Sequence, residues 1–328
     1  MPHPQDFSGI IPVEFSNQII EEAIQQSAVL QLGQRLPMGT TITDLPIPKT
    51  LPKAAWTGAP GGRKAWTDLM LETTSIHAEE VAAVTAIPDS YLEDSTINIW
   101  AWARPRLSEA IAVALDDAIL FGLDAPPTFP QPSATGVGGL MHNDYSTAIP
   151  AAGTTDAVDI VNRAMGQVEG QGLNVSGHAA DLMVKASFRG VRDETGALLL
   201  GTEQAGTGQR NTLYGVPIAY NSWSTRNNNF LSGAWNNLLI GVRQDIRFAM
   251  DPNAVIADDA GKVIISGFQD NTTPMKVWAR FGCVVIKPVT VRTPLGAKPF
   301  ARALLSQFGA TGGEGNEVVT TKRGAAKE

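Results

Sequence analysis

The tip of a predicted hairpin reads Trp56-Thr57-Gly58-Ala59-Pro60-Gly61-Gly62-Arg63-Lys64-Ala65-Trp66, and extended segments flank it at Thr40 to Leu51 and Ala65 to Ile87. At about 3.3 Å per residue, the two arms of this hairpin reach roughly 50 to 60 Å, which is farther than a domain of this size can cover. The hairpin therefore has no predicted core of its own. A two-stranded ribbon is marginally stable alone in water, so another copy of the chain is its expected support. This feature favours assembly over catalysis.

Four side chains of the tip are the predicted contacts with a neighbouring subunit: Trp56, Arg63, Lys64 and Trp66. The two indoles lie close to Gly and Pro residues, and a two-stranded ribbon has no core in which they could be buried. Tryptophan is strongly favoured among the residues that dominate interface energies. The alternative is that both tryptophans fold back onto their own subunit.

The composition excludes several classes of protein. The 328 residues are 43% hydrophobic, enough for one large domain or two of ordinary size. No run of about 18 apolar residues predicts a membrane helix, and the N-terminus lacks the pattern of a signal peptide. The net charge of -7 argues against a protein that binds the phosphate backbone of a nucleic acid. The single cysteine, Cys283, excludes an internal disulfide, and its apolar surroundings predict a buried strand.

The hairpin separates two helical patterns. Before it, Phe15, Ile19 and Ile24 share one face of a helix that ends near Gly33, and residues 1–36 are predicted to be an arm and not a core element. After it comes the strongest helical pattern, a spine helix that ends at Gly122. Pro105 either kinks this helix or marks the first turn of its longer half. The predicted core residues of the spine helix are Leu107, Ile111 and Leu115, and Asp116-Asp117 is interpreted as a polar flank.

From Thr154 onward the sequence mixes one or two helices with short strands. A helix carries Val158, Val161, Met165 and Val168, and Phe188 to Arg192 is a predicted helical turn. The predicted strands are Asp181–Lys185, Val216–Tyr220, Asn237–Gly241, Ile246–Met250, Val263–Ser266 and Lys276–Ile286. The segment from Gly309 to Glu328 has little to bury and is predicted to be loose.

No catalytic, cofactor-binding or metal-binding residues are predicted. The tip glycines do not fit the spacing of a phosphate-binding loop and lack its hydroxyl residue. The histidines, His3, His77, His142 and His178, are far apart and lack the spacing of a zinc site. The chain has no G-x-S-x-G elbow of a serine hydrolase. It is therefore not expected to be an enzyme, and no cofactor is expected.

The order of these parts resembles the major capsid proteins of tailed bacteriophages, which have the Hong Kong 97 type shell fold of the α+β class. The motifs that carry the resemblance are Ile11-Pro12-Val13-Glu14-Phe15, Ala54-Ala55-Trp56-Thr57-Gly58, Ile87-Pro88-Asp89-Ser90-Tyr91-Leu92-Glu93-Asp94-Ser95, Asp116-Asp117-Ala118-Ile119-Leu120-Phe121-Gly122, Val191-Arg192-Asp193-Glu194-Thr195-Gly196, Leu213-Tyr214-Gly215-Val216-Pro217 and Ala279-Arg280-Phe281-Gly282. Their order and spacing together are more specific than any single motif.

The resemblance implies a division of the chain into six segments. They are an N-terminal arm (1–36), an extended loop hairpin (37–87), a peripheral domain with the spine helix (88–135), an axial domain (136–281), return strands (282–308) and a flexible tail (309–328). Family members often have an acidic residue just after the loop tryptophan, whereas this chain has Ala59-Pro60, so its loop contacts are expected to differ.

The resemblance also implies a structural function. Subunits of this family form pentamers and hexamers that tile an icosahedral shell around packaged double-stranded DNA, without sequence-specific binding and without a membrane. The implied partners are further copies of the chain, a portal and, in some relatives, a decoration protein. Since the chain begins directly with the arm, any scaffolding protein is expected to be separate. The implied location is the virion, with assembly in the bacterial host cytoplasm.

Three alternatives stay open. Some relatives crosslink the shell covalently by an isopeptide bond between a loop lysine and an asparagine of a neighbouring subunit. In this chain the loop lysines are Lys49, Lys53 and Lys64, and Asn271 is a conceivable acceptor. The same fold also builds encapsulin nanocompartments, whose particles hold a protein cargo in place of DNA. A soluble α/β enzyme with an unrecognised site is the third alternative, and such an enzyme would have to account for a long ribbon with aromatic residues at its tip.

Overall fold

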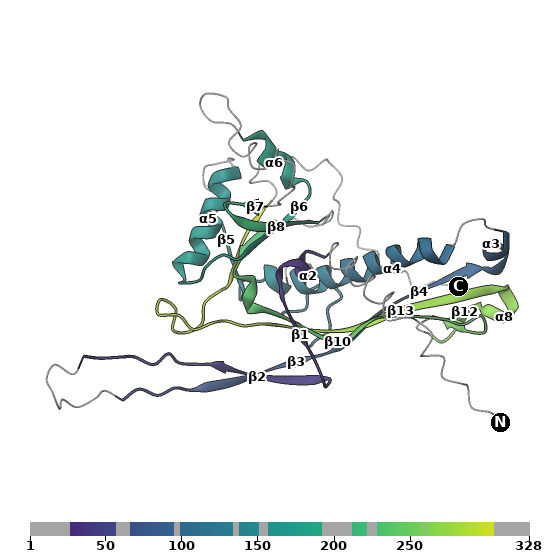
Figure 1. Ribbon diagram of the computed structural model, residues 1–328, viewed down its shortest axis with the longest axis horizontal. Coiled ribbons are helices and arrows are strands. Elements are labelled where there is room, and N and C mark those ends of the chain that lie inside the picture. Colours follow the sequence, from purple (N-terminus) through teal and green to yellow (C-terminus); the bar gives the residue numbers. More distant parts are fainter. Residues whose placement is uncertain are drawn as a thin grey trace, which may run out of the picture.

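A computed structural model gives the fold, and it describes residues 27–56, 66–94, 99–133, 138–150, 157–191, 212–221, 228–258 and 260–304. The molecule has three parts (Figure 1): a long hairpin, a six-stranded sheet with helices against it, and a long four-stranded sheet with one helix lying along it. The mixture of helices and strands confirms the predicted α+β class. Among the described residues, no helix is both long and apolar enough to span a membrane.

The four-stranded sheet has the order β1 (Gln34–Pro37), β10 (Leu238–Met250), β13 (Thr272–Val285) and β4 (Glu79–Pro88). β1 runs parallel to β10, and the other neighbours are antiparallel. Helix α4 (Ile99–Asp116), the predicted spine helix, lies along this sheet (Figure 1). The far end of the sheet carries α3 (Asp89–Asp94), β11 (Val255–Ala257), β12 (Val263–Ser266) and α8 (Gly267–Asp270).

The six-stranded sheet has the order β5 (Ser146–Ala148), β14 (Phe300–Leu304), β9 (Asn228–Gly233), β6 (Gly177–Asp181), β8 (Val216–Asn221) and β7 (Thr212–Leu213). Helices α5 (Ala157–Gly170) and α6 (Val184–Gly190) lie next to this sheet (Figure 1). Of the apolar stripe that the sequence predicts for α5, Val161 and Val168 are buried with apolar side chains of the sheet, whereas Met165 and Val158 are only partly buried. This stripe and the sheet form a separate hydrophobic core.

Two strand predictions need correction. The predicted strands Asn237–Gly241 and Ile246–Met250 are one strand, β10, whose pairing with β13 shifts register between Val242 and Gln244 and again before Arg247. The predicted strand Asp181–Lys185 is wrong, because the strand β6 ends at Asp181. The Asp181 carboxylate accepts a hydrogen bond from the Met183 amide at 2.8 Å, and this local turn ends the strand before α6 begins.

The hairpin is shorter than predicted. β2 (Ile42–Pro48) pairs with β3 (Leu71–His77), but from Glu79 onward the returning chain leaves the ribbon and becomes β4 of the four-stranded sheet. The base of the hairpin also has a small core, in which Ile76 and Ala78 are buried with Met38 and Leu239. The prediction of a hairpin without any core is therefore wrong at its base and holds only toward its tip.

The two sheets cut across the segments that the resemblance implies. β10 and β13 come largely from the range 136–281, yet they pair with β4 and lie against the spine helix. β14, from the range 282–308, instead joins the six-stranded sheet between β5 and β9. Pairing between distant strands is decided by tertiary packing, so a division into consecutive segments could not reveal it.

The predicted arm is partly a core element. Residues 1–26 lie outside the described residues. The next segment forms a short helix, α2 (Ala28–Leu32), in which Ala28, Val29 and Leu30 are buried in the largest hydrophobic core. The prediction that all of residues 1–36 stand outside the core is therefore wrong for this helix.

Candidate assembly surfaces

The hairpin tip presents two uncovered indoles. Trp56 and Trp66 have relative exposures of 103% and 82%, so no described part of the subunit covers either side chain. Arg63 and Lys64, the other predicted tip contacts, lie outside the described residues. That all four residues contact a neighbouring subunit stays a prediction, and the exposure of both tryptophans is what such contacts require.

Polar contacts align the two arms of the hairpin both within the paired strands and closer to the tip. The Ser75 hydroxyl and the Asp44 carboxylate are 2.5 Å apart, and Lys49 pairs with Glu72 at 3.5 Å. Closer to the tip, Thr67 donates a hydrogen bond from its hydroxyl to the Lys53 carbonyl oxygen. These contacts are exposed and individually weak, so they set the alignment of the ribbon more than its stability.

A groove of about 780 Å³ lies between α4, β4 and the loop that follows the spine helix. We call it the acidic groove, because acids predominate among the charged residues that line it: Glu79, Glu80, Glu109, Asp117 and Asp124, with Arg106 as the base. Its apolar lining includes Val81, Val113, Leu123, Phe129 and Phe281. Arg106 is paired with Glu109 at 3.1 Å, and Glu80 is paired with Lys276 at 3.5 Å and with Arg280 at 3.3 Å, so the acidic excess of the rim comes from Glu79, Asp117 and Asp124.

The spine helix places its predicted core residues unequally. Ile111 and Leu115 are buried in the largest hydrophobic core, whereas Leu107 is partly buried and packs against the edge of that core. Pro105 lies inside the helix. The helix continues past Asp116 as a π-helical turn, Asp117–Phe121, and ends at Gly122, which has the left-handed φ of 69° that favours glycine.

The prediction for Asp116 is wrong, because this residue is not a polar flank but a buried carboxylate. Its Oδ1 accepts from the Ser27 hydroxyl at 2.6 Å and from the Val29 amide at 3.2 Å. Its Oδ2 accepts from the Ala28 amide at 3.0 Å and from Asn221 Nδ2 at 2.5 Å. Burial raises the pKa of Asp116 to about 6, although these hydrogen bonds oppose the shift. We call these five residues the Asp116 joint.

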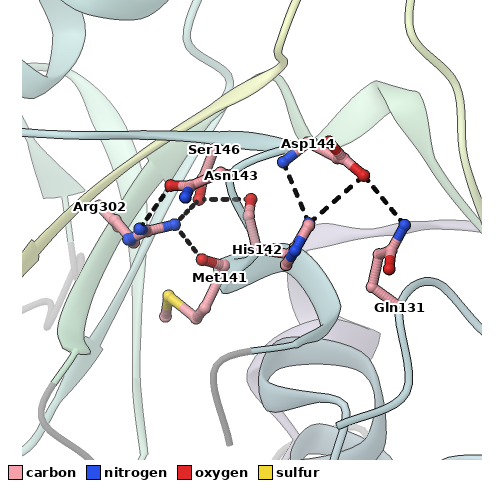
Figure 2. Close-up of polar contacts among 7 residues, drawn as sticks. All are labelled: Gln131, Met141, His142, Asn143, Asp144, Ser146 and Arg302. Carbon is pink, nitrogen blue, oxygen red and sulfur yellow. Dashed lines mark hydrogen bonds and ion pairs between the residues drawn. The ribbon is translucent and has the colours of Figure 1, made fainter.

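A second polar cluster holds the connection between the spine helix and the six-stranded sheet (Figure 2). The Arg302 guanidinium donates to the Met141 carbonyl, to the Ser146 hydroxyl and to Asn143 Oδ1. Its partners are thus neutral oxygens. Nearby, the Asp144 amide donates to His142 Nδ1 at 3.2 Å, and Gln131 Nε2 donates to Asp144 Oδ2 at 2.9 Å.

Sequence reasoning missed both polar clusters. Hydrogen-bonded partners within them are up to 161 residues apart in the sequence, so no local pattern joins them. The one local signal was the serine Ser27 directly before an apolar stretch, which is typical of a helix N-cap. The sequence could not show that a distant carboxylate would share this cap.

The described residues contain no group of three or more His, Cys, Asp or Glu that could hold a metal ion. Cys283 is buried, as predicted, and burial raises the pKa of its thiol, so it is a poor nucleophile. His178 is buried in the six-stranded sheet, where its ring stacks on the ring of Phe230.

The sequence is similar to a known family over most of its length. The model of the phage capsid family matches residues 8–293. The probable major capsid protein gp17 of Mycobacterium phage L5 is 29% identical over 124 residues, which is 38% of each chain. The corresponding protein of Mycobacterium phage D29 is 28% identical over 124 residues, or 38% of this chain and 39% of the relative. These matches therefore span well under half of the curated relatives.

Solved structures extend the similarity. A chain from Mycobacterium phage Adephagia is 25% identical with a TM-score of 0.66, and the alignment covers 85% of this chain and 90% of that chain. A chain from Microbacterium phage Oxtober96 shares the fold at 22% identity, with a TM-score of 0.68 and coverage of 92% and 96%. The chain belongs to the phage capsid family, and its fold is the Hong Kong 97 type of tailed-phage capsid proteins.

Proposed function

We propose that this chain is a major capsid protein that assembles as pentamers and hexamers into an icosahedral shell enclosing double-stranded DNA. The observation that carries the proposal is the hairpin, because its described arms extend away from the rest of the subunit and end at Trp56 and Trp66, which are uncovered. Two exposed indoles would be a standing aggregation risk in a monomer. Membership of the phage capsid family supports the same role.

The hairpin tip of one subunit contacts the acidic groove of a neighbour in this proposal. Between Asp44 and Asp68 the sequence contains the bases Lys49, Lys53, Arg63 and Lys64 and no acid. The groove has the opposite charge and an apolar lining, so it suits a basic segment with aromatic side chains. Electrostatic complementarity of this kind would set the register of the contact more than its affinity.

The role is structural and involves no catalysis. The net charge of -7 suits a surface that lies near packaged DNA without adhering to it. The proposed partners are further copies of the chain, the enclosed DNA and a portal. The proposed location is the virion, with assembly in the host cytoplasm.

Negative-stain microscopy and sedimentation of the purified full-length chain test this function. Closed shells or rings of five and six subunits are the expected result. A uniform monomer at high protein concentration would contradict the proposal and favour the soluble enzyme. Shells isolated from the natural host should contain DNA, whereas shells filled with protein cargo would identify an encapsulin-like compartment.

Charge reversal tests the groove contact. Glu109→Lys with Asp124→Lys should slow assembly and make it more sensitive to salt, because the rim then repels the basic tip. Arg63→Glu with Lys64→Glu should have the same effect alone and should partly restore assembly when combined with the reversed groove. Assembly at the normal rate in both separate variants would exclude this contact.

A further inference from the structure

A single carboxylate joins three segments that are far apart in the sequence. Asp116 is 89 residues from Ser27 and 105 residues from Asn221. The four hydrogen bonds of the Asp116 joint supply two donors to each carboxylate oxygen, which is close to the full accepting capacity of the group. Removing one donor therefore leaves one accepting position of the buried Asp116 carboxylate without its hydrogen bond. The other three hydrogen bonds are then expected to rearrange.

Each segment of the Asp116 joint belongs to a different part of the fold. Asp116 ends α4, which lies along the four-stranded sheet, and Asn221 ends β8 of the six-stranded sheet. Ser27 is the N-cap of α2 and the first residue that the structure describes. The joint is thus where the spine helix, the six-stranded sheet and α2 meet.

The helix α2 depends on this carboxylate. Its five residues form too short a helix to be stable by itself. The first amides of a helix have no partners within the helix, and here the Ala28 and Val29 amides are satisfied by Asp116. The Ser27 hydroxyl donates to Asp116 and also accepts from the Leu30 amide at 3.1 Å, so the cap and the carboxylate form one network.

We infer that Asp116 is a positioning residue that couples the docking of α2 to the end of β8 through their shared hydrogen bonds. A movement of the six-stranded sheet that withdraws Asn221 loosens the N-cap of α2, and loss of the cap loosens the end of β8. If the proposed function holds, copies of the chain in pentamers and hexamers can adjust α2 and the six-stranded sheet together.

Hydrogen exchange of the full-length, unassembled chain tests the coupling. In Asn221→Ala, the Ala28 and Val29 amides should exchange at least tenfold faster relative to the amides of α5. In Ser27→Ala, the amides at the end of β8 should accelerate relative to α5, because coupling between two sites is reciprocal. Asn143→Ala is the matched control, since it also loses one side-chain hydrogen bond, to Arg302, and should leave α2 unchanged.

The measurement separates a positioning role from a merely structural one. If Asn221→Ala accelerates α2 and α5 by the same factor, or leaves α2 unchanged, the coupling is wrong. Because the chain is unassembled, this result is independent of shell formation. A chain that never forms shells but shows the relative acceleration would overturn the proposed function and leave the coupling intact.

Discussion

The imidazole ring of His178 stacks on the phenyl ring of Phe230 in the core of the six-stranded sheet, with ring centroids 5.6 Å apart and ring planes 23° apart. Burial lowers the pKa of His178 to about 4, and the backbone of Leu213 offsets this shift only in part. The folded subunit therefore keeps the ring neutral at a pH where an unfolded chain has begun to protonate it.

This depressed pKa predicts loss of stability in acid. The full contribution is present above about pH 6.5 and is lost as the pH falls toward 4, with a maximum of about 3 kcal/mol. Over the same pH range Asp116 contributes in the opposite direction, so the test compares the response of two proteins to pH by urea unfolding at pH 7 and pH 4.5. His178→Leu, which cannot be protonated and suits the apolar surroundings, should be more stable relative to the wild type at pH 4.5 than at pH 7, by about 2 kcal/mol. An equal response of both proteins to pH would contradict the prediction.

Asp116 predicts a pH dependence of the opposite sign. Its folded pKa of about 6 lies above the ordinary value of 3.8, so the folded chain binds more protons than the unfolded chain between these values. Its contribution to stability therefore increases as the pH falls from 6 to 4, by up to about 3 kcal/mol. Asp116→Asn should abolish this trend and also lower stability at pH 7, because one amide oxygen cannot replace two accepting oxygens. If Asp116→Asn and the wild type show the same dependence of stability on pH, the raised pKa of Asp116 in the folded chain is contradicted.

The spine helix predicts unequal costs for two equal truncations. Leu115 is buried in the largest core, so Leu115→Ala should lower the free energy of unfolding by about 2 to 5 kcal/mol. Leu107 is only partly buried, and Leu107→Ala should cost clearly less. The periodicity of the sequence predicts the same face for both residues and cannot distinguish them. Equal shifts of the denaturation midpoint for the two variants would contradict this difference in packing between Leu107 and Leu115.

Gly139 is predicted to tolerate no side chain. Its φ is 55°, and a Cβ atom would lie 2.3 Å from the Ile119 carbonyl oxygen, where the chain crosses the end of the spine helix. Gly139→Ala should cost about 3 kcal/mol or more through strain and backbone displacement. Gly166→Ala is the control, because Gly166 lies in α5 with open space around it, and this variant should be neutral or slightly stabilising. Similar stability of both variants would contradict the tight crossing.

The sequence predicts the local elements of this fold better than their partners. The helix of α5 and the strand at Val263–Ser266 follow from apolar periodicity, and both are present. Periodicity did not show that β4 leaves the hairpin to pair with β13, or that β14 crosses into the other sheet. These pairings join residues that are far apart, so they depend on packing that no local window contains.

The candidate assembly surfaces likewise differ in how far the sequence alone reveals them. Trp56 and Trp66 are recognisable as tip residues because glycine and proline surround them, and the structure leaves both exposed. The acidic groove and the Asp116 joint are not recognisable, since each is formed by segments that meet only after folding. A single aspartate at the end of a helix has the same local sequence whether it faces solvent or caps another helix.

The hairpin tip gives the most direct prediction for assembly. Trp56→Ala combined with Trp66→Ala should leave the circular dichroism of the subunit largely intact, because neither side chain is buried within the described subunit. Truncation of an interface tryptophan typically costs about 2 kcal/mol or more, and each contact recurs around a closed shell. Sedimentation should therefore shift from shells toward free subunits or capsomers.

The control for this pair is Trp56→Phe combined with Trp66→Phe, which keeps an aromatic ring at each position and should retain more assembly than the alanine pair. The ordering follows from buried apolar area, since phenylalanine preserves most of the contact and alanine almost none. Normal assembly of the alanine pair would show that no neighbour covers the two indoles. Unfolding of the isolated alanine variant would instead place both side chains in the fold of their own subunit, and either result would end the intersubunit role.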